Sequence, residues 1–160
     1  MNKIFKWLAD APAVLFIFIF WLVGCLWNIS FNAFVRISDI QLSSPSGFEG
    51  PQSIFDYITV ILVAPLIETA LFQALPYHLL RKGRFFQKRV WLIIVISGLF
   101  FALQHFYSVV YIVFAFIPGI LLAAGYHIRQ GKHPFFCIFA VHLLINATPL
   151  VYELLGFGIK

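Results

Sequence analysis

The sequence predicts an all-α fold, a polytopic transmembrane helical bundle of about five spans. Of its 160 residues, 62% are hydrophobic and 11% are charged, and the mean hydropathy is +0.95, whereas soluble domains are ~45–50% apolar. Five apolar runs are each close to the ~20 residues that cross a bilayer core, at residues 11–34, 54–80, 90–106, 109–127 and 134–155. The runs leave no room for a soluble domain, so we expect a single integral membrane domain over residues 1–160.

Basic residues lie between the apolar runs in a pattern that sets the orientation. The N-terminal lysines, the five basic residues of 81–89 and the pair Arg129 and Lys132 fall on one side of the membrane if the runs alternate, and the loop at 36–53 leans acidic. Cytoplasmic loops carry the excess of Lys and Arg, so we expect a cytoplasmic N-terminus. Separately, we expect the membrane to be a bacterial inner (cell) membrane. The net charge of +5 is therefore topological and does not indicate nucleic-acid binding.

Neither cysteine indicates a disulfide framework or a metal site. Cys25 and Cys137 both lie in apolar runs without the spacing of either. The stretch from Leu22 to Cys25 resembles a lipoprotein-type cleavage box, which makes a signal peptide the alternative interpretation of the first run. Because the hydrophobic stretch continues through Ile29, where a processed lipoprotein turns polar, we interpret the first run as a span.

Four polar side chains lie inside the apolar runs: Glu68, His105, His142 and Asn146. An ionisable side chain in the middle of a membrane helix costs at least ~2.5–3.5 kcal/mol, so such residues usually face a protein interior and serve a site or a pathway. Counted from the cytoplasmic end of each run at ~1.5 Å per residue, the four lie ~12–22 Å deep in a core ~30 Å thick. We therefore predict that they meet in one intramembrane site.

The spacing of these residues also gives their direction. His142 and Asn146 are four residues apart and so share a helix face. Gly98, Phe101 and His105 form one stripe on the third run, which lets Phe101 pack one turn from the imidazole and lets Gly98 admit a neighbouring helix. Taken singly, a buried histidine is often a packing element, and Asn146 is explained equally well as an interhelical hydrogen bond worth ~0.6 kcal/mol.

Pro65 lies one turn before Glu68 in the second run. It removes the hydrogen bond to the carbonyl of Ile61, so we expect a kink there and a partner for that carbonyl from elsewhere. Other polar residues are expected to support the site through hydrogen bonds: Thr69, Gln73 and Gln104. Three further histidines lie at membrane edges, where we expect interfacial anchoring: His78, His127 and His133.

Three short patterns occur in order on the second, third and fifth runs. They are Glu68-Thr69-x-x-x-Gln73, Phe101-x-x-x-His105 and His142-x-x-x-Asn146. Together they resemble the three motifs of the CPBP intramembrane proteases, the family of CaaX proteases and bacteriocin-processing enzymes also called Abi, which includes the Ras-converting endopeptidase. The resemblance covers residues 54–155, a CPBP-like core formed by the second to fifth runs.

The resemblance implies an intramembrane endopeptidase without a cofactor. In that family's mechanism Glu68 and His105 would activate a water molecule, and His142 and Asn146 would stabilise the oxyanion. These residue types suit those tasks, because carboxylates act as general bases and imidazole and amide donors bind oxyanions. The implied substrate is a peptide or a membrane-anchored protein. No metal is required, although a Glu/His/His zinc site is a chemical alternative.

The first motif departs from the family pattern of Glu-Glu-x-x-x-Arg. Thr69 replaces the second Glu and Gln73 replaces the Arg, so one buried charge of each sign is removed together. Since they are four residues apart, we expect Thr69 and Gln73 to hydrogen-bond each other. The change favours an alternative function, a non-catalytic immunity, chaperone or scaffold protein. A second alternative, a proton or ion conduit using Glu68, is disfavoured because no inverted repeat is visible.

Overall fold

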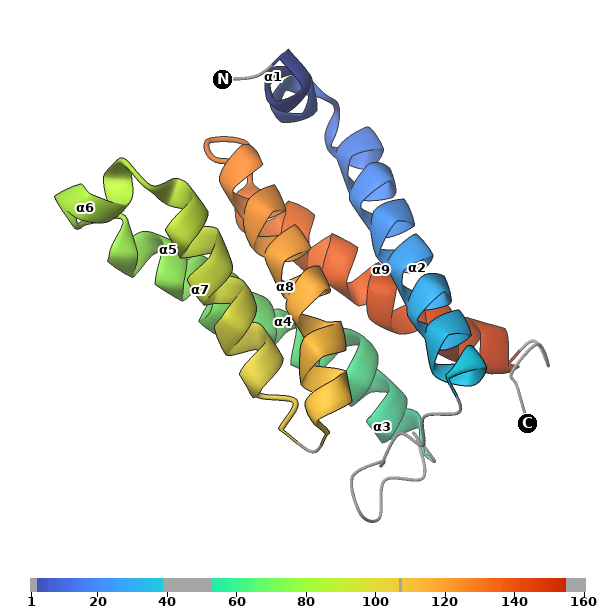
Figure 1. Cartoon of the computed structure of the whole chain (residues 1–160). Coiled ribbons are helices and arrows are strands. Elements are labelled where there is room, and N and C mark those ends of the chain that lie inside the picture. The colour runs from blue at the N-terminus through green and yellow to red at the C-terminus, as the bar shows by residue number, and fades with distance from the viewer. Residues whose placement is uncertain (1–2, 39–52, 107, 155–160) are drawn as a thin grey trace.

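The computed structural model describes residues 3–38, 53–106 and 108–154, and in these residues the chain is helical and contains no strand (Figure 1). The part of the predicted loop at residues 39–52 lies outside the described residues. The helices, in chain order, are α1 (Lys3–Asp10), α2 (Ala13–Ile37), α3 (Ile54–Ile58), η1 (Thr59–Val63), α4 (Ala64–Glu68), η2 (Thr69–Ala74), α5 (Leu75–Leu80), α6 (Arg84–Gln87), α7 (Val90–Leu103), α8 (Val109–Ile128) and α9 (Pro134–Leu154).

All five predicted runs are helical, and the protein is a helical membrane bundle. Within the described residues, four helical segments are long and apolar enough to cross a membrane: Ala13–Val35, Ile54–Leu80, Val109–Ile128 and Pro134–Val151. The fifth, α7, has 14 residues and is therefore about 21 Å long, shorter than a ~30 Å hydrocarbon core. Large apolar side chains on the outer surface remain exposed, as expected for contact with lipid.

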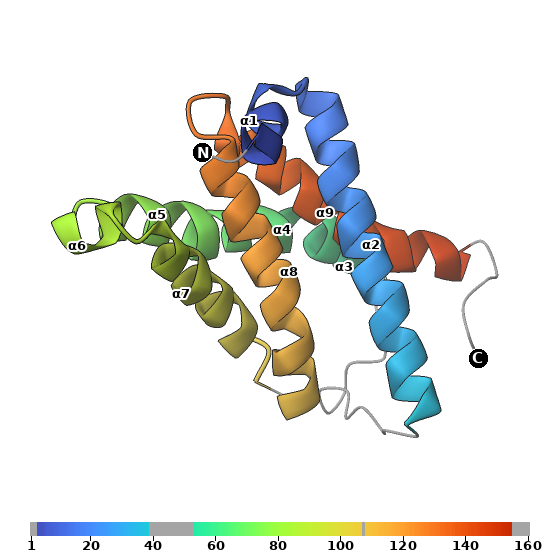
Figure 2. The same cartoon turned by 45° about the horizontal axis from the view of Figure 1, so that its top comes forward.

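Helix α8 lies between α7 on one side and the pair α2 and α9 on the other (Figures 1 and 2). The predicted close approach at Gly98 is confirmed: a Cβ built on Gly119 of α8 would lie 2.9 Å from the Gly98 carbonyl oxygen and 3.0 Å from the Phe101 ring. Small residues let helix backbones approach in this way within membranes. The contact holds Phe101, and with it the end of α7, in a fixed position relative to α8.

The second span is one helical segment in which each proline is preceded by a wider π-helical turn. Turn η1 precedes Pro65, and turn η2 precedes Pro76. Proline cannot donate a backbone hydrogen bond, and its ring clashes with the carbonyl four residues earlier. A π turn shifts the ladder by one residue, as the bond from the Ala64 N–H to the Thr59 carbonyl shows, and π turns often occur at functional sites. Glu68 lies between the two turns.

The widened turn changes which carbonyl needs a new partner. In the π pattern the donor for the Val60 carbonyl would be the N–H that Pro65 lacks, so Val60, not the predicted Ile61, is the residue in need. The Asn146 side chain on α9 donates from Nδ2 to this carbonyl at 3.2 Å. Asn146 therefore ties α9 to η1, in addition to any role in the site.

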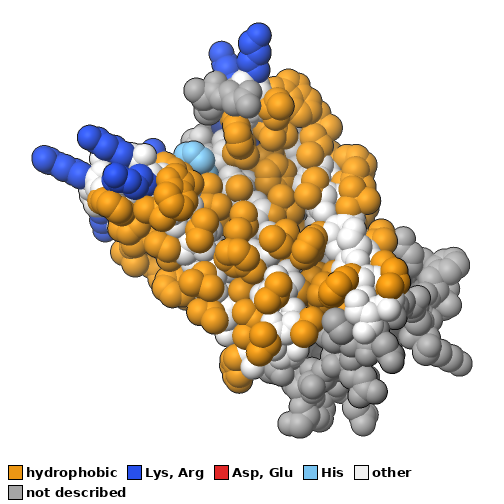
Figure 3. All heavy atoms as spheres, viewed as in Figure 1, with side chains coloured by type: hydrophobic (Ala, Val, Ile, Leu, Met, Phe, Trp, Pro, Cys, Tyr) orange, Lys and Arg blue, Asp and Glu red, His pale blue; other side chains and the backbone are white. Residues whose placement is uncertain are grey.

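Cationic side chains lie at one end of the bundle. On the face shown in Figure 3, Lys and Arg side chains gather over α1 and α6, and the remaining described surface is mostly hydrophobic. Val14 is 80% exposed, Val113 65% and Trp91 61%, although each is apolar. This surface fits a bundle whose sides contact lipid tails and whose basic end lies among headgroups. The protein is therefore an integral membrane protein.

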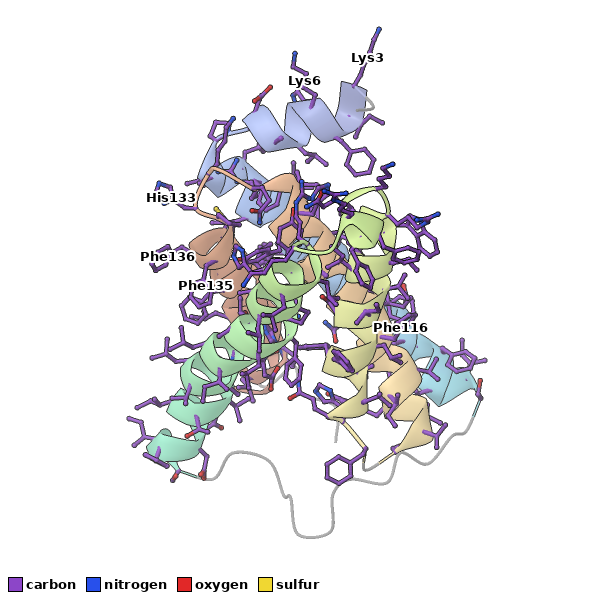
Figure 4. All side chains as sticks on the ribbon, turned by 90° about the vertical axis from the view of Figure 1, so that its left-hand side faces the viewer. Lys3, Lys6, Phe116, His133, Phe135 and Phe136 are labelled. Atoms are coloured by element: carbon purple, nitrogen blue, oxygen red, sulfur yellow. The ribbon has the colours of Figure 1, made fainter. Side chains whose placement is uncertain are left out.

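Helix α1 lies across the basic end, and Lys3 and Lys6 point away from the bundle (Figure 4). Arg129, at the end of α8, holds the C-terminal end of α1 in place through hydrogen bonds. Its side chain is 4% exposed and its Nη1 donates to the carbonyls of Ala11 at 2.8 Å and Ala9 at 3.3 Å. Sequence reasoning gave Arg129 only a topological role, but in the structure it is a buried link between the end of α8 and the N-terminal segment.

Replacing Arg129 with methionine is expected to lower the stability of the protein by about 1.5–3 kcal/mol, the usual worth of hydrogen bonds to a charged group. Thermal unfolding in detergent micelles measures the change. Lys132→Met is the matched control, because it removes the neighbouring exposed ion pair between Lys132 and Asp10, which is worth about 0–1 kcal/mol. Equal loss of stability in the two variants would contradict this role of Arg129.

Candidate active site

Glu68 is the last residue of α4 and lies directly before the π turn η2. Its side chain is 19% exposed, and its Oε2 lies 3.4 Å from Nε2 of His142 on α9. An acid and an imidazole from different spans therefore meet inside the bundle, as the depth estimate predicted. Such a buried pair is costly in lipid and usually serves a site.

His142 is enclosed, with a side chain 3% exposed. Its Nδ1 lies 3.5 Å from the Thr69 hydroxyl oxygen, at the long limit of a hydrogen bond. Glu68 and Thr69 are adjacent in the chain and contact opposite nitrogens of the same ring. Since an ionised carboxylate only accepts, this arrangement favours the tautomer in which His142 Nε2 carries the hydrogen and Nδ1 accepts from Thr69.

His105 follows the end of α7, which is shorter than the predicted run 90–106. Its Nδ1 lies 2.9 Å from the Phe101 carbonyl oxygen, and its backbone N–H bonds three residues back to Ala102. In a continuing α-helix the backbone N–H of His105 would bond to the Phe101 carbonyl, but here the His105 side chain occupies that carbonyl. Such competition between a side chain and the backbone ends helices. Since a carbonyl only accepts, Nδ1 carries the hydrogen, and Nε2 of the neutral ring is the basic nitrogen.

Phe101 lies between the two histidines. Its ring centroid is 5.2 Å from that of His105 and 5.4 Å from that of His142. The predicted packing of Phe101 against His105 is thereby confirmed. The aromatic ring fixes the positions of both imidazoles, and it is itself held by the contact of α7 with Gly119.

The expected hydrogen bond between Thr69 and Gln73 is wrong. The Thr69 hydroxyl lies against His142 instead, and both polar atoms of the Gln73 amide are buried without a hydrogen-bond partner in the described part of the chain. The Gln104 Nε2 atom is likewise buried without a hydrogen-bond partner among the described residues. Thr69 and Gln73 are 0% and 1% exposed, so the altered first motif faces the interior, next to the acid.

Two features of the site were beyond sequence reasoning. The contact of Thr69 with His142 depends on where α9 crosses the second span, and the bond of Asn146 to Val60 depends on the π turn. The sequence signal for the bond between Asn146 and Val60 was Pro65, which leaves a nearby carbonyl without its backbone donor. Within residues 3–38, 53–106 and 108–154, no three side chains of His, Cys, Asp or Glu are grouped as metal ligands.

A family model matches the part of the chain that contains these residues. The model of the Rce1-like family, described as type II CAAX prenyl endopeptidases, matches residues 50–148, which include Glu68, His105, His142 and Asn146. The chain belongs to the Rce1-like family. Comparisons with curated proteins and with solved structures gave no significant match.

Membership in the Rce1-like family indicates an endopeptidase that acts on a protein substrate in a membrane environment. The matched region begins just before α3 and ends within α9, so it contains every element that contributes to the described cluster. Helices α1 and α2 precede the match. They pack on α8 and α9 and thereby support the cluster from outside.

Proposed function

We propose that this Rce1-like protein hydrolyses a peptide bond of a membrane-anchored protein or peptide, using a water molecule activated without a metal. The observation that carries the proposal is the 3.4 Å approach of Glu68 to His142 in the interior of a lipid-exposed bundle. A buried ion pair contributes little to stability, because desolvation of the two charges offsets their attraction. A role in function therefore explains this pair better than a role in stability. A general base beside a hydrogen-bond donor is what amide hydrolysis requires.

In the proposed reaction Glu68 removes a proton from a water molecule that His105 orients through Nε2. The water oxygen attacks the scissile carbonyl, whose oxygen becomes an oxyanion. Because Glu68 is neutral once it has taken this proton, the Nε2 hydrogen of His142 can turn from Glu68 to the oxyanion. The second Nδ2 hydrogen of Asn146 also donates to the oxyanion, since the first Nδ2 hydrogen is used by Val60. Glu68 then returns the proton to the departing amide nitrogen as the carbon–nitrogen bond breaks, so no covalent enzyme intermediate forms.

The test is hydrolysis of a panel of membrane-anchored peptides by the purified protein in detergent or liposomes. Cleavage in water enriched in oxygen-18 should place one heavy oxygen in the new carboxylate, as read by mass spectrometry. Turnover should persist after treatment with EDTA and with 1,10-phenanthroline. Loss of activity with both chelators, restored by zinc, would contradict a metal-independent mechanism.

A second candidate function, a non-catalytic scaffold or immunity protein, is favoured by the altered first motif. Gln73 replaces a cation and leaves both amide atoms without partners in the described residues, and Thr69 replaces an acid. Absence of turnover across the panel, with a protein that is folded by thermal unfolding, would favour this candidate over the protease.

Replacing Asn146 with leucine is expected to reduce both activity and stability. Loss of an oxyanion donor lowers kcat by about 10²–10³-fold, and the Val60 carbonyl left without its donor costs about 1–3 kcal/mol. Peptide cleavage and thermal unfolding measure the two effects. Asn32→Ala is the control, because Asn32 is exposed and its described hydrogen bond lies within its own helix, to the Asn28 carbonyl. An unchanged melting temperature in Asn146→Leu would argue against the structural bond.

A further inference from the structure

A second polar site lies at the basic end of the bundle, apart from the Glu68 cluster. It is an open cavity of about 370 Å³ between the ends of α5 and α8, within the ~300–1,000 Å³ range of small-molecule sites. The lining residues are Tyr77, His78, Arg81, Lys82, His127 and Gln130. None of them belongs to the proposed catalytic machinery, and sequence reasoning treated the histidines only as interfacial anchors.

Two Tyr-His dipeptides build the wall of this cavity. The Tyr77 hydroxyl lies 2.8 Å from His127 Nδ1, and His78 Nε2 lies 3.0 Å from the Tyr126 hydroxyl. Each tyrosine therefore pairs with the histidine of the other dipeptide, and the two bonds join α5 to α8. Both tyrosines are 3% exposed, whereas His127 is half-buried and His78 is exposed, so the frame is anchored in the interior by its tyrosines.

The hydrogen bonds of this frame leave donors for the cavity. Arg81 Nη1 donates to the Tyr77 hydroxyl at 2.7 Å, an arrangement that favours donation of the hydroxyl's own hydrogen to His127 Nδ1. The neutral His127 ring then carries its hydrogen on Nε2. Since the guanidinium has five N–H donors, Arg81 retains donors beyond the one used by Tyr77.

The cavity is also cationic. It is lined by Arg81 and Lys82 and by no acidic side chain. In the described part of the chain the ion pairs are Lys132 with Asp10 and His142 with Glu68, so neither cation of the cavity is neutralised by a carboxylate there. A cluster of hydrogen-bond donors that includes two cations without a carboxylate partner is suited to bind an anion.

The position of the cavity indicates where the anion comes from. It opens at the end of the bundle where Lys and Arg gather over α1 and α6 (Figure 3), and that end lies among lipid headgroups if the apolar sides contact lipid tails. Basic pockets between membrane helices on the cytoplasmic side bind the headgroups of anionic lipids. We infer that this cavity binds the phosphate of an anionic phospholipid headgroup, with Arg81, Lys82 and His127 as its donors.

The test uses the purified full-length protein in detergent micelles and follows its melting temperature during titration with dioctanoyl phosphatidylglycerol. A saturable rise is expected, at lower concentration than with dioctanoyl phosphatidylcholine, whose headgroup has no net charge. Arg81→Gln and Lys82→Gln should each raise the midpoint concentration about fivefold, the loss of one cation near the surface. Lys82 is exposed, so Lys82→Gln tests the site without disturbing the frame.

The matched control is Arg84→Gln. Arg84 is exposed on α6, at the same end but outside the cavity, so this variant removes the same charge and should keep the wild-type midpoint. Equal shifts in the Arg81, Lys82 and Arg84 variants would overturn the site in favour of general surface attraction. Equal midpoints for the two lipids, or for phosphatidylglycerol and inorganic phosphate, would overturn the assignment to an anionic lipid. Protection by a tripeptide acid, but not its amide, at the lipid's midpoint would assign the cavity to a substrate carboxylate instead.

Discussion

Glu68→Gln is expected to abolish detectable cleavage of a membrane-anchored peptide, because it removes the only carboxylate in the described cluster. Glutamine keeps the size of the side chain and can still contact His142, but it cannot accept a proton from water. Loss of a general base typically lowers the rate by about 10²–10⁴-fold. The measurement is kcat/KM with purified protein, normalised to the amount of folded protein by thermal unfolding.

The control for this variant is Asp10→Asn. Asp10 is also a carboxylate next to a basic partner, but it lies at the surface, 2.8 Å from Lys132 and 59% exposed. Removing its charge should leave cleavage unchanged. If Glu68→Gln retained wild-type kcat/KM, Glu68 would be removed from the mechanism, and the proposal of a glutamate-activated water would fail with it.

The sequence predicts the helices well because a segment that crosses the hydrocarbon core must be apolar along its length, so its limits are visible in the hydropathy. Runs 54–80 and 109–127 agree with the observed helical segments to within a residue. The end of α7 is different, since the side chain of His105 takes the Phe101 carbonyl and stops the helix at Leu103. A hydropathy pattern cannot report such a competition between a side chain and the backbone.

The meeting of Glu68 with His142 was predictable because each helical residue adds a constant rise, so the depth of a side chain in the membrane follows from its position in the run. Contacts across helices depend instead on rotation and local pitch. The π turns at the prolines change both, so the partner carbonyl moved from Ile61 to Val60, and Thr69 contacts His142 instead of Gln73. Sequence spacing measured on a regular α-helix does not contain that information.

The crossed Tyr-His pairs were missed for a related reason. The repeated dipeptide is visible in the sequence at Tyr77 and Tyr126, but a dipeptide at a membrane edge is usually an interfacial anchor. The pairing of each tyrosine with the other's histidine follows only from the crossing of α5 and α8. The cavity that this pairing frames is therefore a property of the fold rather than of either segment.

His142→Leu is expected to lower kcat by about 10²–10³-fold with little change in KM. The Nε2 hydrogen of His142 is proposed to stabilise charge that develops only in the transition state, and removal of one oxyanion donor has this cost. Leucine is close in volume and apolar, so it fills the site that His142 occupies at 3% exposure. Peptide cleavage over a range of substrate concentrations separates kcat from KM.

His133→Asn is the matched control for the His142 variant. His133 is an exposed histidine in the turn before α9, with a positive φ of 54° that asparagine also adopts readily. This variant should cleave at the wild-type rate, so loss of a histidine as such is not the cause of any defect. A rise in KM with unchanged kcat in His142→Leu would instead mean that His142 binds the substrate equally in the ground and transition states. The oxyanion would then depend on Asn146 alone among the proposed donors, and the 3.4 Å contact with Glu68 would serve to orient the base.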